Sequence, residues 1–266
     1  MPQQTQKLIV IKLGGSIIDS KDSAVRDVLR LSRAGYRLVL VHGGAKMVTQ
    51  WMADLGLRAE FYQGERITDS RALSVVTAVL AGLANKETTA ALIASGVKAV
   101  GISGADGGLI EGKIRDPKLG WLGDVVKVNP GVIESLLDGG FVPVISPVSL
   151  NSGIQKSDDP LLLNINGDTV AGEIAAAMKA EKLIFLTDVE GIRDSSEKLL
   201  GNVSMQSLAG LLDSGVAYGG MIPKLKACAR AAESGVVCRI VDGRNPAAAY
   251  TAVETESGGT TISPVE

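Results

Sequence analysis

Short runs rich in Val, Ile and Leu recur along the chain and alternate with segments of helical periodicity. The runs do not alternate apolar with polar residues, which is typical of parallel strands buried on both faces. Strands that alternate with helices pack as a sheet between two helical layers. The sequence therefore predicts an α/β fold, a three-layer αβα sandwich around a mostly parallel central sheet. Strands are expected near 7–13, 37–42, 98–102, 142–148, 182–187 and 237–241, and helices near 22–34, 46–55, 69–94, 131–138, 168–179, 205–214, 223–234 and 246–253.

Two segments depart from this pattern. Segment 108–128 has the pattern of two antiparallel ribbon strands with a turn through Asp116 and Pro117. The polar stretch 151–159 is expected to be a solvated loop, either an ordinary surface loop or the seam between two lobes. A chain of 266 residues can bury one full core, so we expect a single domain, 1–266, with lobes that meet near residues 165 and 166.

Composition and charge exclude several classes of protein. The net charge is −2 and there is no long basic run, so nothing indicates a nucleic acid or an anionic membrane as partner. No apolar stretch reaches the roughly 18 residues of a membrane span, and the N-terminus lacks a signal-peptide pattern. Cys228 and Cys238 lack the CxxC spacing and are expected to be reduced, packed residues. We therefore expect a cytoplasmic enzyme.

Glycines gather where the expected strands end. Lys12 lies at the end of one apolar run and is followed by Gly14 and Gly15, and a second run ends at Gly43 and Gly44. A third such end lies at 101–104. Glycines leave the backbone amides uncovered, and a cation beside them can meet an anionic ligand. Three such strand ends predict a phosphate-handling site.

A second cation with the same surroundings is Lys224. It follows Gly219, Gly220 and Pro223, and Pro223 suits the first turn of the helix that comes next. Most lysines are surface charges. The flanking glycines and the helix N-terminus, whose dipole favours an anion, indicate a binding site instead.

Polar residues at alternate positions, Asn164, Asn166 and Asp168, lead out of an apolar strand. Asp168 could be a plain helix N-cap. Alternate positions would also put two amides and a carboxylate on one side, where they could hold a polar substrate and two lysines. Arg66, within 63–69, could bind a carboxylate bidentately, or it could be an exposed charge beside a helix cap at Thr68 or Asp69.

Absent motifs narrow the chemistry further. No two glycines are separated by one residue, so the GxGxxG dinucleotide fingerprint is missing. Segment 107–113 resembles a Walker A loop, but Ile114 occupies the Ser/Thr position. The chain has one histidine, which argues against a histidine-rich metal site and a Ser-His-Asp triad. Hydride transfer and triad hydrolysis are therefore excluded.

In order and spacing, these motifs resemble the amino acid kinase family over nearly the whole chain, from about Lys7 to Ile262. Each motif is weak alone, and the set is specific. The resemblance is carried by Ile-Lys-Leu-Gly-Gly (11–15), Val-His-Gly-Gly (41–44), Gly-Glu-Arg-Ile-Thr-Asp (64–69), Ala-Asn-Lys-Glu (84–87), Gly-Ile-Ser-Gly-Ala-Asp-Gly-Gly-Leu-Ile (101–110), Asn-Ile-Asn-Gly-Asp-Thr-Val-Ala-Gly (164–172), Leu-Thr-Asp-Val-Glu-Gly (186–191) and Gly-Gly-Met-Ile-Pro-Lys (219–224).

The resemblance is greatest to those family members that phosphorylate N-acetyl-L-glutamate in arginine biosynthesis. It implies transfer of the γ-phosphoryl group of ATP to the side-chain carboxylate, which gives an acyl phosphate. Mg²⁺ would be held mainly by the ATP phosphates, with no metal ligand from the protein. A carboxylate acceptor carries no proton to remove, so the lack of a histidine base agrees with this chemistry. The lobe of residues 1–165 would bind the acyl substrate, and the lobe of residues 166–266 would bind ATP.

The family pattern implies a role for each matching residue. Lys12 and Lys224 would stabilise the migrating phosphoryl group, and Asp168 would hold both lysines. The amides of Gly14, Gly15, Gly43 and Gly44 would bind phosphoryl oxygens. The residues expected to bind the acyl substrate are Gly43, Gly44, Ala45, Arg66 and Asn164. The residues expected to bind ATP are Gly14, Gly15, Asp188, Gly191, Ile192, Arg193, Tyr218, Gly220 and Met221.

The chain departs from the family pattern at three places: Ala45 replaces a glycine, Gly167 replaces an alanine, and segment 255–260 is one residue shorter. Few residues precede the first strand, so we expect a homodimer that arginine does not inhibit. A regulatory PII-type partner is left open. The alternative acceptor is carrier-linked aminoadipate or glutamate, although Glu60 and Glu65 flank Arg66 where a basic rim would be needed. A silent ligand sensor is the other alternative, against which the retained Lys12, Asp168 and Lys224 argue.

Overall fold

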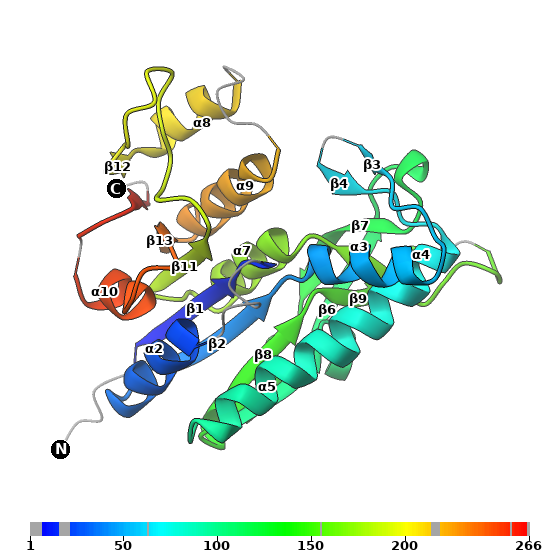
Figure 1. Ribbon diagram of the computed structural model, residues 1–266, viewed down its shortest axis with the longest axis horizontal. Helices are drawn as coiled ribbons and strands as arrows, with labels where there is room; N and C mark the ends of the chain where they lie inside the picture. The colour runs from blue at the N-terminus through cyan, green and yellow to red at the C-terminus, as the bar shows by residue number, and fades with distance from the viewer. Residues whose placement is uncertain are drawn as a thin grey trace.

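An eight-stranded sheet runs through the centre of the computed structural model, which describes residues 7–15, 22–62, 64–154, 156–213, 219–255 and 257–264 (Figure 1). Its strand order is β12-β14-β13-β11-β1-β2-β8-β5. Neighbouring strands are parallel except β13 and β14, which are antiparallel. The strands are β1 (Leu8–Leu13), β2 (Arg37–His42), β5 (Ala99–Ser103), β8 (Val142–Ser146), β11 (Lys182–Thr187), β12 (Asn202–Val203), β13 (Val237–Asp242) and β14 (Thr260–Ile262).

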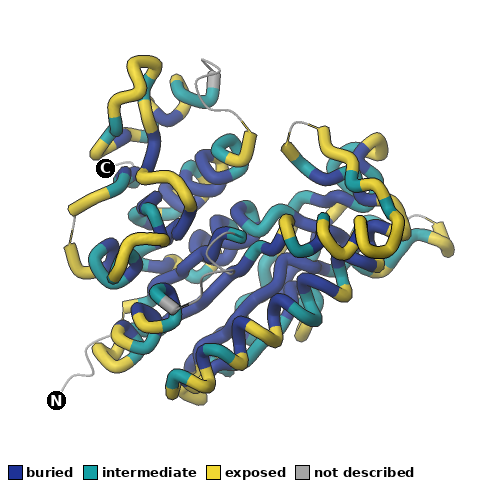
Figure 2. The backbone as a smooth tube through the Cα atoms, viewed as in Figure 1, coloured by how far each residue is buried: buried dark blue, intermediate teal, exposed yellow. Residues whose placement is uncertain are grey.

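Helices cover both faces of this sheet, as β1 illustrates. Val10 packs in one core cluster with residues of α6, α7, α8 and α9, whereas Ile9 and Ile11 pack in another with residues of α2, α5 and α10. Successive strand residues point to opposite faces, so a strand covered on both faces is apolar throughout. Figure 2 shows these central strands buried. The predicted three-layer αβα sandwich is confirmed. The helices are α2 (Asp22–Arg33), α5 (Asn85–Ala94), α6 (Gly131–Asp138), α7 (Gly167–Ala177), α8 (Met205–Asp213), α9 (Met221–Ala232) and α10 (Ala248–Glu254).

A small closed barrel stands beside the sheet, with strand order β10-β7-β6-β9. Its β6 (Ile110–Ile114) and β7 (Leu122–Val128) form the predicted antiparallel ribbon, joined through the short 3₁₀ helix η3 (Pro117–Leu119). The predicted strand 142–148 was wrong in extent: it divides at Pro147 into β8 and β9 (Val148–Asn151). At Pro147, which has no N–H for a strand ladder, the chain leaves the sheet and enters the barrel. The fourth barrel strand is β10 (Leu162–Ile165).

The expected helix 69–94 is continuous but not α-helical throughout. It consists of α4 (Ser70–Val76), the π-helical segment η1 (Thr77–Ala84) and α5. Asp69 is its N-cap, because its Oδ1 accepts a hydrogen bond of 2.7 Å from the Ala72 N–H. Together with α3 (Ala45–Asp54), α4 and η1 form a third apolar cluster that packs on the barrel through Val148.

The remaining elements are short: the hairpin β3 (Phe61–Tyr62) and β4 (Glu65–Arg66), and the 3₁₀ turn η2 (Asp106–Gly108). Figure 1 shows β11, β13 and helices α8 to α10 at one end of the molecule, and the barrel with α3 and α4 at the other, while α5 runs beside β8. The division into lobes near residue 165 stays a prediction. Within the described ranges, no helix has the length and hydropathy to span a membrane. Some predictions fall outside the described residues: the site residue Tyr218, Gln63 of the segment 63–69, and residue 214 at the end of an expected helix.

Candidate active site

A cavity of about 860 Å³ lies at the carboxyl ends of β1, β2 and β11. Because β1 lies between β11 and β2, this is a point where the strand order reverses, the usual location of a ligand in such sheets. Every predicted site residue that the structure describes lines this cavity: Lys12, Gly14, Gly15, Gly43, Gly44, Ala45, Arg66, Asn164, Asp168, Asp188, Gly191, Ile192, Arg193, Gly220, Met221 and Lys224. Tyr218 falls in the segment that is not described, so its place is not tested.

Two lysines from distant parts of the chain meet at one carboxylate. The Lys12 Nζ lies 2.6 Å from Asp168 Oδ1, and the Lys224 Nζ lies 3.0 Å from Asp168 Oδ2. All three side chains are at most 11% exposed. The Lys224 ammonium also lies 5.0 Å from the ring centroid of Phe185. The alternative that Lys224 is a solvated surface charge is therefore wrong.

The charge balance of this triad follows from its burial. Burial alone raises the pKa of Asp168, but the two ammonium groups outweigh it and hold the pKa at about 2. For Lys12, burial lowers the pKa, the neighbouring Asp168 carboxylate opposes this, and the Lys224 charge adds to it. With both lysines protonated, the three groups carry one net positive charge. That charge is available to a negatively charged ligand in the cavity.

The local fold explains how Asp168 reaches this position. Asn166, not Asp168, caps helix α7: its Oδ1 accepts a hydrogen bond of 2.8 Å from the Asp168 N–H. The interpretation of Asp168 as the N-cap was therefore wrong. Because the chain turns into the helix at Gly167, strand alternation does not explain why Asn164, Asn166 and Asp168 all face the cavity. The cap places Asp168 in the first helical turn, and Lys224 lies correspondingly in the first turns of α9.

The four glycine amides are not equivalent. The Gly14 N–H donates to the Leu186 carbonyl at 2.9 Å, and the Gly43 N–H donates to the Leu13 carbonyl at 3.1 Å. These two amides are used inside the sheet, so the expectation that they bind phosphoryl oxygens was wrong. Within the described ranges, the amides of Gly15 and Gly44 have no such backbone acceptor. The two residues adjoin, since a Cβ at Gly15 would lie 3.9 Å from Gly44 N.

Arg66 is a buried cation in the wall of the cavity, only 6% exposed. Its Nη2 donates to the Thr49 hydroxyl at 2.7 Å and to the Ala45 carbonyl at 3.0 Å, and its guanidinium lies 4.8 Å from the Phe61 ring centroid. Burial lowers the pKa of Arg66. No carboxylate of the described residues lies within 4.0 Å of it. Its Nη1 also donates to the Met52 sulfur at 3.2 Å. The alternative of an exposed charge is wrong, and the positive charge of the guanidinium has no ion-pair partner among the described residues.

A second polar group in this wall is Asn164, whose Nδ2 donates to the Thr68 hydroxyl at 3.0 Å. That hydroxyl donates in turn to the Arg66 carbonyl at 2.9 Å. Sequence reasoning considered Thr68 only as a helix cap and missed Thr49, which lies four residues after Ala45 on α3. The sequence signal for Thr49 was its position one helical turn after Ala45, which places both residues on the same side of α3. Glu65, beside Arg66, forms an ion pair with Arg115.

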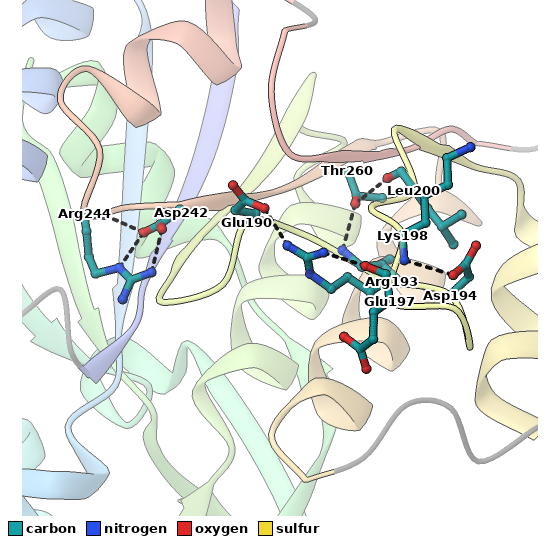
Figure 3. A network of polar contacts seen from close by, with 10 residues as sticks. Glu190, Arg193, Asp194, Glu197, Lys198, Leu200, Asp242, Arg244 and Thr260 are labelled. Atoms are coloured by element: carbon teal, nitrogen blue, oxygen red, sulfur yellow. Dashed lines mark hydrogen bonds and ion pairs between the residues drawn. The ribbon is translucent and has the colours of Figure 1, made fainter.

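The opposite side of the cavity is formed by the loop after β11 (Figure 3). The Ile192 N–H donates to the Thr260 hydroxyl at 2.8 Å, which ties this loop to β14. Arg193 braces the loop from within: it donates to the Glu197 carbonyl at 2.5 Å and to the Glu190 carboxylate at 2.7 Å. Within the described ranges, no group of three or more His, Cys, Asp or Glu side chains could hold a metal ion.

Comparisons with known proteins agree with this geometry. A family model described as the amino acid kinase family matches residues 7–242. Acetylglutamate kinase from Dehalococcoides mccartyi is 49% identical over 98% of this chain and 96% of that protein, and acetylglutamate kinase from Synechococcus sp. (strain RCC307) is 44% identical over 94% and 85%.

Solved structures share the fold. The structure of smu.665 from Streptococcus mutans UA159 has a TM-score of 0.83 at 26% identity, over 97% of this chain and 99% of that chain. Carbamate kinase from Giardia lamblia has a TM-score of 0.71 at 18% identity, over 98% and 99%, a likeness of fold alone. From the match to the family model and the similarity of its relatives, this chain belongs to the amino acid kinase family.

Proposed function

We propose that this chain transfers the γ-phosphoryl group of ATP to the side-chain carboxylate of N-acetyl-L-glutamate and forms an acyl phosphate. The observation that carries the proposal is one cavity with two separate cationic positions: the Lys12–Asp168–Lys224 triad, and Arg66 with no acidic partner in the described residues. A phosphoryl donor suits the first position, and the free carboxylate of an acyl amino acid suits the second. The relatives that are 49% and 44% identical are acetylglutamate kinases, which supports this acceptor.

In this mechanism the main obstacle is repulsion between two anions, the acceptor carboxylate and the γ-phosphate. Lys12 and Lys224 would neutralise the phosphoryl oxygens from two sides while Asp168 keeps both ammonium groups in place. Phosphoryl transfer has a loose transition state, so in-line placement and fixed charge account for most of the acceleration. The amides of Gly15 and Gly44 would add hydrogen bonds that strengthen as charge spreads over the oxygens.

The acceptor would be held by the wall opposite the nucleotide loop. Arg66 would bind the main-chain carboxylate through its buried charge and through the N–H groups on Nε and Nη1 that its contacts with Ala45, Thr49 and Met52 do not use. The Nδ2 of Asn164 is already bonded to Thr68, which leaves its Oδ1 to accept the N–H of the acetylated amine. This arrangement would favour an acetylated substrate, since a free ammonium would lie near several cations.

The donor would enter as the magnesium complex of ATP. A cavity of about 860 Å³ is within the usual range of about 300–1,000 Å³ for small-molecule sites. The N-termini of α7 and α9 both face it, and helix N-termini favour phosphate oxygens. Residues 188–193 and 219–221 would line the nucleoside side. Magnesium, bound mainly through the ATP phosphates, would reduce their negative charge. We further propose that the enzyme is a cytoplasmic homodimer.

The test is an acyl-phosphate trapping assay with hydroxylamine across acetylglutamate, glutamate, aspartate and aminoadipate. We expect ATP-dependent hydroxamate with acetylglutamate in clear excess over the others. No hydroxamate with acetylglutamate, together with formation from another acceptor or from a carrier-linked one, would overturn the proposed substrate. ATP consumption without any acceptor product would overturn the proposed reaction.

Matched lysine variants test the proposed roles. Lys12→Ala and Lys224→Ala are each expected to lower turnover by orders of magnitude and keep the fold. The controls are Lys7→Ala, at the exposed start of the same strand, and Lys226→Ala, on the exposed face of the same helix. Both controls should keep normal turnover. Near-normal turnover in either active-site variant would remove its assigned role.

A further inference from the structure

The single histidine of the chain, His42, is fully buried at the end of β2, directly before the Gly43–Gly44 turn. Its Nδ1 lies 2.8 Å from the carbonyl oxygen of Gly43, and its Nε2 lies 3.1 Å from Nδ2 of Asn85. Neither residue lines the cavity. Neither has a part in the mechanism given above.

The contacts of Asn85 determine which ring nitrogen carries hydrogen. Asn85 is fully buried, and its Nδ2 also lies 2.9 Å from the Val144 carbonyl and 3.1 Å from the Ile102 carbonyl. A carbonyl oxygen can only accept, so the His42 Nδ1 at 2.8 Å from the Gly43 oxygen carries hydrogen. The Asn85 Nδ2 carries only hydrogens, shared among three acceptors, so it offers no acceptor to a hydrogen on Nε2. The ring is then the neutral tautomer with hydrogen on Nδ1. That Nδ1–H donates to the Gly43 carbonyl.

This hydrogen bond fixes the orientation of the next amide. The peptide that joins Gly43 to Gly44 is planar and trans, so its carbonyl and its N–H point in opposite directions. With the carbonyl held by His42, the Gly44 N–H is directed to the other side, where Gly15 lies. Gly44 is itself held by packing: it has φ +145°, and a Cβ there would lie 2.7 Å from Leu80 Cδ2.

The π-helical segment η1 explains how one continuous helix contacts both Gly44 and His42. η1 carries Leu80 and Ala84 against Gly44, and the helix then resumes α-helical bonding at Asn85. A π segment contains one more residue per turn than an α-helix and is frequent at functional sites. It brings Asn85 to the carboxyl ends of β5 and β8, where the amide meets Ile102, Val144 and His42.

We propose that His42 and Asn85 are positioning residues which direct the Gly44 amide toward the migrating phosphoryl group. The proposal rests on the proposed kinase function, because the Gly44 amide matters only if a phosphoryl oxygen meets it. His42 touches no substrate. Its effect on the Gly44 amide passes through the Gly43 carbonyl.

The first experiment is independent of activity. ¹⁵N NMR of tag-free protein with labelled histidine observes a single imidazole and distinguishes its tautomers. We expect the neutral form with hydrogen on Nδ1. A ring with hydrogen on Nε2, or an imidazolium at neutral pH, would overturn the proposal. Asn85→Asp should add hydrogen at Nε2 and so replace the neutral Nδ1–H tautomer, because a carboxylate requires a donor there while the Gly43 carbonyl still requires one at Nδ1. An unchanged tautomer in this variant would count against Asn85.

Two His42 variants separate positioning from simple packing. In His42→Asn, the side-chain Nδ2 can replace the ring Nδ1 as donor to the Gly43 carbonyl. In His42→Gln, the amide is one bond further out, where it can meet Asn85 but not serve as the δ donor. We expect His42→Gln to lower kcat by about 10- to 100-fold with little change in the KM for ATP. His42→Asn should lose clearly less turnover although it fills the core less well.

The opposite order of turnover, with His42→Gln at least as active as His42→Asn, would show that the side chain acts only by packing and would overturn the proposal. Thr88→Val is the control, since Thr88 is buried one turn from Asn85 and bonds only its own helix at the Ala84 carbonyl. It should change neither tautomer nor kcat. If wild-type protein shows the expected tautomer but phosphorylates no acceptor, the proposed function fails and the orienting hydrogen bond stands.

Discussion

Replacing Asp168 by Asn removes the charge that holds both lysines and keeps the shape of the side chain. The pKa of Asp168 is about 2 against an ordinary value of 3.8, and this difference corresponds to about 2.5 kcal/mol of stability at neutral pH. The side chain is 9% exposed, so solvent screening reduces this little. Asp168→Asn should therefore lower the free energy of unfolding by about 2.5 kcal/mol. For a chain of this size that is about 5–10 °C in Tm.

The pH dependence of this difference checks its electrostatic origin. Because the folded-state pKa is depressed, the contribution is complete above about pH 5 and is lost as pH falls through 3.8 and then through the folded-state value of about 2. Urea unfolding of both proteins should show the full gap at pH 7 and about half of it at pH 3. Asp138→Asn, in an exposed ion pair with Arg37, is the control and should change stability by at most about 0.5 kcal/mol. A variant as stable as wild type at pH 7, or a gap unchanged at pH 3, would refute the reasoning.

Three further predictions concern single positions. Arg66→Lys should raise the KM for acetylglutamate by about tenfold or more and leave the KM for ATP unchanged, because an ammonium cannot bond Thr49 and Ala45 and present further N–H groups to a carboxylate as the planar guanidinium can; steady-state kinetics decide this. Gly44→Ala should reduce both stability and turnover, because φ is +145° and Leu80 is 2.7 Å from the new Cβ. Gly35→Ala, with φ +90° and open space around it, should cost only about 1 kcal/mol, and equal costs would disprove the packing argument. Asp27→Ala, which removes a cap of α10, should destabilise by about 1–2 kcal/mol without changing kcat; a loss of turnover in stable protein would contradict a purely structural role.

Sequence predicted much of the fold because the central strands β1, β2, β8 and β11 are buried on both faces and therefore apolar throughout. The candidate site could be predicted from the strand ends, because Lys12, Gly43 and Asp188 lie at or directly after the ends of apolar runs. These features depend on local composition. They can therefore be predicted without knowledge of distant contacts.

What the sequence did not reveal depends on contacts across the fold. The N-cap is Asn166 rather than Asp168 because β10 ends at Ile165 and the helix begins at Gly167. Composition does not locate the end of a strand to within one or two residues. The use of the Gly14 amide by Leu186 requires knowledge of the strand order. The π-helical segment has no distinct residue pattern, and the barrel closes through β9 and β10 only because Pro147 ends the sheet strand.

The central claim is that Lys12 and Lys224 act together on one migrating phosphoryl group. Calorimetric titration with ADP, acetylglutamate and aluminium fluoride measures this most directly, because the fluoride complex imitates the phosphoryl group in flight. We predict tight, fluoride-dependent binding by wild-type protein, and loss of that fluoride dependence in both Lys12→Ala and Lys224→Ala with ADP affinity nearly retained. Fluoride-dependent binding of undiminished strength in either variant would contradict the account.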